Sequence, residues 1–200
     1  MSLKIAGIIF LLGIAVLAVI IALLFLPRAV EAEPVRAAIR FFGLYGYLFL
    51  SVATLTTPFL REVTQAFGKP FLKIHHSFSI LGIIFITLHP VFNAIERLSL
   101  SVFVPSFDSW DRFWLLAGRP AFIILYVALV AAFLRVKAPK YWRAFHALMY
   151  VVLLFGIVHA NLIGNDFGNL GIMIIFNALF IASLAGFVLK RYRTYIMKRK

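Results

Sequence analysis

Six long apolar stretches, separated by short polar links, divide this chain. A helix needs about 20 mostly apolar residues to cross the hydrocarbon core of a membrane, and each stretch is near that length. The fourth is the shortest, and Phe113–Ala117 are expected to extend it. The pattern predicts an all-α fold: one domain over residues 1–200, built as a six-helix integral membrane bundle. The predicted spans are Ile5–Leu26, Ala38–Leu60, Phe71–Ala94, Pro120–Leu134, Trp142–Leu162 and Gly171–Leu189.

Composition agrees with a membrane class. Hydrophobic residues make up 64% of the chain, whereas a soluble domain is nearer half apolar. Cys is absent, which excludes disulfide exchange, thiolate-ligated metals and iron–sulfur clusters. The first stretch is long for a signal peptide and no Ala-x-Ala type site clearly follows it, so it is predicted to be a retained span.

The formal net charge of +13 is unevenly distributed. Basic residues beside apolar stretches set topology and contact anionic lipid headgroups, so nucleic acid is not an expected partner. The links after the second and fourth spans and the tail are basic, whereas the opposite loops balance their charges. The positive-inside rule therefore predicts a multi-pass protein of the cell membrane with both termini in the cytoplasm. The basic regions contain Arg61, Lys69 and Lys73; Arg135, Lys137, Lys140 and Arg143; and the tail Lys190–Lys200.

Four of the five histidines form two pairs within apolar stretches. His75 and His89 lie on the third stretch, and His146 and His159 lie on the fifth. Each pair spans roughly 20 Å along a helix, which is most of a hydrocarbon core about 30 Å thick. Ionisable groups at such depths are costly and are usually functional. Zn or Cu sites gather three or four close ligands, whereas two haem b groups, each with two axial histidines, fit this spacing.

Helical phase refines the choice of ligands. At about 100° per residue, His89 returns to within about 40° of His75, which favours His75 over His76, although His76 stays an alternative. The 13-residue step from His146 to His159 leaves the two side chains roughly 140° apart around the helix. The fifth span therefore needs a bulge or a bend, with Gly156 as the expected site, unless the haems are staggered. Gly82 is expected either to admit a haem face or to allow close helix packing.

Two segments carry a family resemblance. They are HHSFSILGIIFITLHP at 75–90 and YWRAFHALMYVVLLFGIVH at 141–159, with Trp142 four residues before His146 and Tyr150 four after it. In these features the chain resembles the ferric-reductase-like transmembrane domain family. That family includes NADPH oxidases, ferric-chelate reductases and the haem subunit of the periplasmic methionine sulfoxide reductase system. The last branch typically has Arg at the position of His75, so it fits less well.

The resemblance implies a function and a ligand set. His75 with His146 would hold an inner haem, and His89 with His159 an outer haem, with all four as axial ligands of iron. The protein would be a membrane oxidoreductase, or its electron-transfer subunit, of the b-type cytochrome class. Electrons would pass from a cytoplasmic flavoprotein to an extracytoplasmic acceptor such as ferric chelate, oxygen or a periplasmic redox partner. Because no G-x-G-x-x-G motif is present, the flavin would lie on a partner reductase or on a dehydrogenase domain of a longer chain.

Three cations are assigned to this chemistry. Lys73 and Arg143 are expected beside the inner haem, where they neutralise propionates or steer an acidic donor, with topology and lipid binding alone as the alternative. Arg40 loosely resembles the second-helix arginine near the oxygen-reducing site of NADPH oxidases, so it is a candidate acceptor-site cation. Anchoring to a lipid headgroup is the alternative for Arg40. The loop Leu98–Gly118 is amphipathic enough to lie on the membrane surface over the outer haem.

Two other functions stay open at this point. One is a quinol-linked cytochrome b subunit, which also places histidine pairs on two helices and would need a quinone pocket near one haem. The other is a transporter or assembly factor whose histidines relay protons or bind a metal without haem. The absorbance spectrum of the purified protein separates the haem proteins from the transporter class.

Overall fold

The structure is a computed structural model that describes the backbone of residues 3–199 and the side chains of residues 5–197. Within these residues every regular element is a helix, so the predicted all-α class is confirmed. Five helical segments are long and apolar enough to cross a membrane. They contain the main helices α1 (Leu3–Val30), α2 (Pro34–Thr56), α4 (Phe71–Arg97), α8 (Met149–Ile163) and α9 (Leu170–Arg199).

The predicted fourth span is shorter than expected. Helix α6 (Gly118–Phe133) has 16 residues, and at 1.5 Å per residue it is about 24 Å long. Phe113–Ala117 do not extend it, because α5 (Trp110–Leu115) is a separate helix that ends in a turn before Gly118. The count of six spanning helices is therefore not confirmed, and five candidate spans are present in the described residues.

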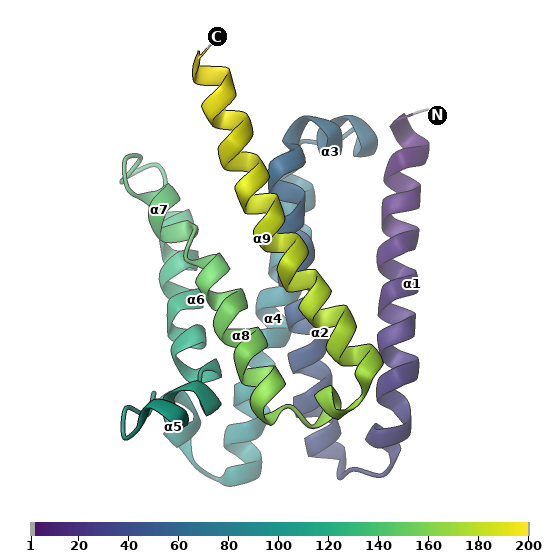
Figure 1. Cartoon of the computed structure of the whole chain (residues 1–200), viewed down its shortest axis with the longest axis vertical. Helices are drawn as coiled ribbons and strands as arrows, with labels where there is room; N and C mark the ends of the chain where they lie inside the picture. The colour runs from purple at the N-terminus through teal and green to yellow at the C-terminus, as the bar shows by residue number, and fades with distance from the viewer. Residues whose placement is uncertain (1–2, 200) are drawn as a thin grey trace.

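The helices run between two distinct ends of the bundle (Figure 1). One end, called the terminus end here, holds the start of α1, the end of α9, α3 (Leu60–Phe67) and α7 (Trp142–His146). The other, called the loop end, holds α5 and the short η3 helix (Asn165–Gly168). Helices α4 and α8 run in the same direction, from the terminus end to the loop end. The side chains of Lys198–Lys200 lie outside the described residues.

Helix α2 is the most buried helix of the bundle and packs closely against α4. A Cβ atom at Gly46 would meet the backbone of Ile86 at 2.6 Å, and one at Gly82 would meet the side chain of Leu50 at 2.8 Å. Small residues let membrane helices approach in this way, which replaces the missing hydrophobic driving force with close packing. Gly82 thus faces α2, which favours the helix-packing alternative for this glycine.

The irregularity predicted for the fifth span lies at a different residue. Helix α8 runs unbroken through Gly156, and the helix is interrupted at Ala147 and Leu148, directly after His146. There the amides of Leu148 and Tyr150 bond to carbonyls three residues back, at 3.0 and 3.1 Å. A three-residue repeat turns about 120° per residue, so this stretch rotates His146 toward the face of His159. Gly156 instead packs against the ring of Tyr47, where a Cβ would lie 3.2 Å away.

Candidate functional site

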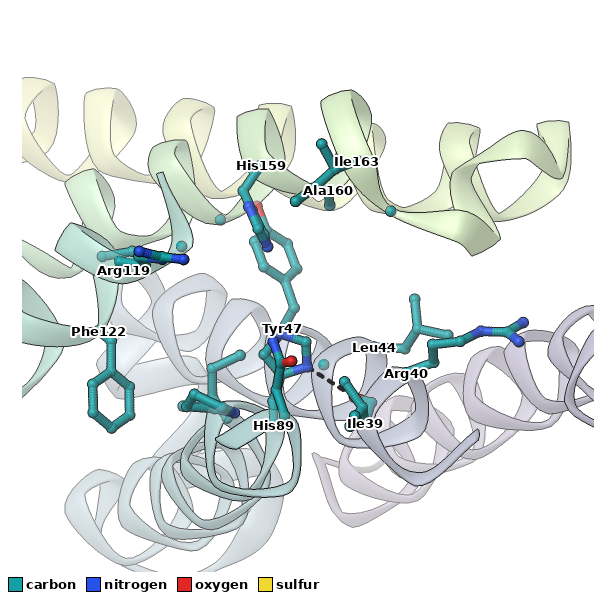
Figure 2. A pocket seen from close by; sticks show the side chains of 18 of the residues that line it. Ile39, Arg40, Leu44, Tyr47, His89, Arg119, Phe122, His159, Ala160 and Ile163 are labelled. Carbon is teal, nitrogen blue, oxygen red and sulfur yellow. Dashed lines mark hydrogen bonds between the residues drawn. The ribbon is translucent and has the colours of Figure 1, made fainter. Parts of the chain in front are cut away.

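The structure brings the four predicted histidines together as two pairs stacked along the bundle. At the terminus end, the ring centroids of His75 (α4) and His146 (α7) lie 6.3 Å apart, with ring planes at 76°. At the loop end, His89 (α4) and His159 (α8) line one cavity of about 500 Å³. Figure 2 shows these two rings reaching into the cavity from opposite walls. His76 is exposed, whereas His75 is partly buried and faces His146.

Each of the four rings is oriented by a backbone carbonyl. The Nδ1 atom of His75 lies 3.1 Å from the carbonyl oxygen of Ala53, and that of His89 lies 2.8 Å from Ile39. On the other side of the bundle, Nδ1 of His146 lies 3.2 Å from the oxygen of Ala128, and that of His159 lies 2.8 Å from Leu115.

These contacts fix the tautomer. A carbonyl oxygen only accepts hydrogen bonds, so Nδ1 carries the proton in each ring. The lone pair is then on Nε2, which is the atom that a neutral imidazole offers to a metal when a hydrogen bond holds the other nitrogen. All four histidines thus share one tautomer.

Two glycines admit the loop-end rings. A Cβ at Gly43 would lie 2.9 Å from Nδ1 of His89, and one at Gly118 would lie 3.0 Å from Cδ2 of His159. Gly43 is four residues after Ile39, so it borders the carbonyl oxygen that His89 contacts. The missing side chain lets the imidazole approach the α2 backbone, which is the close-approach use of glycine.

Four arginines line the loop-end cavity, and two of them, Arg36 and Arg40, are paired with carboxylates. Arg36 at the start of α2 pairs with Glu96 near the end of α4. Arg97 donates from Nε to Oδ1 of Asn93 at 2.8 Å, and Arg119 donates to the carbonyl of Val104 at 2.9 Å. These contacts leave the charges of Arg97 and Arg119 without a carboxylate partner among the ion pairs of the described residues.

Arg40 of α2 is held by two other elements, α1 and η3, rather than pointing freely into the cavity. Its Nε donates to Oδ2 of Asp166 at 2.9 Å, and its Nη2 contacts the other carboxylate oxygen. Its Nη1 donates to the carbonyl of Arg28 at 3.1 Å, and the guanidinium lies over the ring of Phe25. The Arg40 side chain is 14% exposed, which favours a structural role over headgroup anchoring. Asp166 compensates its charge, which weakens its candidacy as an acceptor-site cation.

The other predicted cations lie away from the histidine rings. Lys73 and Arg143 are exposed at the terminus end, and the Arg143 guanidinium lies 5.7 Å from the ring centroid of Trp142. The Trp142 ring in turn lies 6.1 Å from that of His146. Tyr150 does not face His146, because its ring packs on Phe187 at 4.6 Å and its hydroxyl lies 3.4 Å from Oγ1 of Thr57.

Sequence reasoning missed several residues of the site. Asp166 has no predicted role, yet it is 4% exposed and paired with Arg40. Its position as the one acid in an otherwise uncharged loop is a signal that could have suggested a buried pair. Tyr47, which lines the cavity and donates to the carbonyl of Leu153 at 3.1 Å, and the two glycines carry no such signal.

The site could hold a metal only with the help of further ligands. Among the described residues no group of three or more His, Asp or Glu side chains is arranged around one point. A metal ion held by protein side chains alone is therefore not indicated. A pair of imidazoles can still supply the two axial positions of a metal whose other ligands come from a macrocycle.

Comparison with known proteins adds no relative. No protein-family profile, curated protein or solved structure matches this chain. The ferric-reductase-like resemblance consequently rests on the residues of α4, α7 and α8 alone, and the site has to be interpreted from its own geometry.

Proposed function

We propose that this chain is a b-type cytochrome that carries electrons across a membrane through two haems. One would lie between His75 and His146 and the other between His89 and His159. In this proposal α6 (Gly118–Phe133) crosses the membrane as a sixth, short span. The donor is a flavoprotein at the terminus end, which we assign to the cytoplasm, and the acceptor is reached at the loop end.

The observation that carries the proposal is the spacing and the common orientation of the histidine rings. A ring nitrogen lies roughly 1.15 Å from the imidazole centroid and binds a metal at about 2.0 Å, so two axial imidazoles have centroids about 6.3 Å apart. The separation of His75 and His146 has that value, 6.3 Å. Because Nδ1 of each ring is directed to a carbonyl, Nε2 is the free ligand atom. Proton relay or general hydrogen bonding does not require four rings with the same tautomer.

The loop-end pair has the space that a planar group needs. The cavity between His89 and His159 has about 500 Å³, within the usual range for small-molecule and cofactor sites. Apolar side chains such as Leu44, Phe122 and Leu125 line its interior. The cations Arg97 and Arg119 lie at its mouth, where they can pair with the carboxylates of a haem.

When bound, haem supplies one-electron chemistry that imidazole and hydroxyl groups lack. The chain's own residues hold, orient and insulate it. Four backbone carbonyls fix the rings and make each Nε2 a stronger electron-pair donor to a metal. They belong to Ala53, Ile39, Ala128 and Leu115. The apolar walls lower the local dielectric constant, which favours the iron state of smaller net charge.

Single substitutions of the ligands test this assignment. His75→Ala and His146→Ala should each remove one haem, and His89→Ala and His159→Ala the other, as seen in difference spectra of the purified variants. His76→Ala is the matched control and should keep both. Loss of haem in His76→Ala but not in His75→Ala would overturn the assignment. Reduction by a quinol, with no response to a reduced flavin donor, would favour a quinol-linked subunit instead.

A further inference from the structure

The segment between α4 and α6, residues 98–117, exposes an unusual amount of apolar surface at the loop end. It contains the η2 turn (Leu100–Phe103) and α5, and in Figure 1 α5 lies across the direction of α6 and α8. Contiguous apolar patches mark interaction surfaces. The exposed side chains are Leu98 at 92%, Leu100 at 75%, Val104 at 61%, Phe107 at 77% and Trp110 at 74%.

This segment is fixed by contacts with the bundle, so its apolar face has a defined structure. The ring of Phe113 stacks on Phe107 at 5.8 Å and on Trp110 at 6.3 Å. Trp114 then packs its ring edge to face against Phe155 of α8 at 5.4 Å. Ser109 caps α5 by accepting from the amide of Arg112 at 3.2 Å. Although Phe113 and Trp114 make these contacts, the rings of Phe107 and Trp110 remain largely exposed.

The opposite side of the same segment is polar. Asp108 pairs with Arg112 at 2.8 Å, and both side chains are more than half exposed. Asp108 also accepts from the hydroxyl of Ser106 at 2.8 Å, and Asp111 is exposed on α5. The segment is thus amphipathic, with the arrangement of elements that lie in a membrane interface.

The length of α6 fixes the depth of this surface. Its 16 residues span about 24 Å, which is less than a hydrocarbon core of about 30 Å. At its far end, Phe133 is followed by the polar link with Arg135 and Lys137. If that link is at the terminus-end interface, Gly118 does not reach beyond the opposite interface. The α5 helix, which ends just before Gly118, then lies at the boundary of headgroups and acyl chains.

Leu98 provides an independent observation. It ends α4 with φ at 48°, in the left-handed region, where glycine or asparagine is usual. A leucine at this position has a strained backbone. Its side chain is 92% exposed, so contacts with the protein do not offset the strain. Contact with acyl chains gives this side chain a favourable environment.

We propose that residues 98–117 form an interfacial shelf whose apolar face is inserted into the lipid bilayer beside the loop-end cavity. The partner is the bilayer itself, and the proposal does not depend on haem. Arg97 and Arg119 flank the two ends of the shelf and also line the cavity. The mouth of the cavity therefore opens at the level of the lipid headgroups, rather than in bulk water above them.

The absence of Cys from the chain makes the test direct. Single variants Phe107→Cys and Trp110→Cys carry a nitroxide on the apolar face, and Asp111→Cys carries it on the polar face of the same segment. The proteins are reconstituted in phosphatidylcholine vesicles without any partner. Spin relaxation by oxygen, which concentrates in lipid, is compared with relaxation by a neutral nickel chelate, which stays in water.

The shelf predicts that oxygen relaxes labels at 107 and 110 severalfold more strongly than the nickel chelate does, with the order reversed at 111. Leu98→Cys, at a side chain with little protein contact, should behave as 107 and 110 do, and it serves if either aromatic variant misfolds. Strong relaxation by the nickel chelate at 98, 107 and 110 would overturn the proposal. That result would make the face an aqueous surface, available for a protein partner.

Discussion

His75 and His146 come from different helices, yet their imidazole rings lie 6.3 Å apart and their planes are 76° from each other. The two carbonyls that hold them, those of Ala53 and Ala128, belong to α2 and α6. The near-perpendicular arrangement is therefore set by the packing of four helices rather than by either histidine. It has a consequence for the electronic structure of any metal bound between the rings.

When the two axial imidazoles are perpendicular, the dxz and dyz orbitals of a low-spin ferric haem have nearly the same energy. We expect the haem of the terminus end to give a highly anisotropic low-spin signal in electron paramagnetic resonance, at low temperature in the oxidised protein. His75→Ala should remove that signal. An ordinary rhombic low-spin signal that disappears in the same variant would contradict the ring geometry found here.

Gly43 should be sensitive to a single methyl group. In Gly43→Ala the new Cβ would lie 2.9 Å from Nδ1 of His89, so the ring must move away from the carbonyl of Ile39. We expect a lower content or a shifted midpoint potential of the loop-end haem, measured by redox titration, with the terminus-end haem unchanged.

The matched control for this change is Gly13→Ala in α1, where a Cβ meets nothing within 4 Å. That variant should leave both haems as they are and stabilise the helix by about 0.5 to 1 kcal/mol, because alanine is the better helix former. Equal redox properties in Gly43→Ala and the parent protein would show that the Ile39 contact does not position His89.

The pair of Arg40 and Asp166 should contribute to stability. Arg40→Gln leaves a carboxylate that is 5% exposed without its partner, and breaking such a buried pair costs about 3 kcal/mol. Thermal unfolding in detergent should therefore begin at a clearly lower temperature. Arg36→Gln is the control, because the Arg36 side chain is 67% exposed and its pair with Glu96 is screened by solvent.

This prediction separates two roles of Arg40. A structural tie lowers the unfolding temperature and is partly restored by Arg40→Lys. An acceptor-site cation would instead slow the oxidation of the loop-end haem while stability stays at the parent value. The latter pattern would reinstate the role suggested by resemblance.

The basic surface of the terminus end should accelerate reduction by an acidic flavoprotein. Lys73, Lys140 and Arg143 are exposed there, and Glu62 of α3 is already paired with Arg193 at 3.2 Å. We expect stopped-flow reduction rates to fall as salt rises, since a Debye length of about 10 Å at 0.1 M screens exposed charges. Rates that do not change with salt, in protein with intact haem, would leave these cations only a topological and lipid-binding role.

Much of the helix pattern could be predicted because membrane spans are recognised from the length and apolar character of a sequence segment. The expected span Phe71–Ala94 is α4, Phe71–Arg97, and Gly171–Leu189 lies inside α9. The predicted extension of the fourth span was wrong because Phe113–Ala117 are as apolar as the helix that follows. Hydropathy does not register the turn at Leu116 and Ala117.

The pairing of the histidines could be predicted, but their support could not. Depth along a helix follows from residue number, so His75 with His146 and His89 with His159 were the expected neighbours. The break after His146, rather than at Gly156, depends on two local carbonyl bonds that no residue type signals. Gly43 and Gly118 look like ordinary membrane glycines until the rings of His89 and His159 are placed against them.

Binding of two haems by the four oriented imidazoles is tested by the pyridine haemochrome spectrum of the purified chain from haem-replete cells, related to its protein concentration. We expect about two b-type haems per chain, one for each pair of rings. A colourless protein with its helical spectrum intact would contradict it and would return the histidines to proton relay or metal binding.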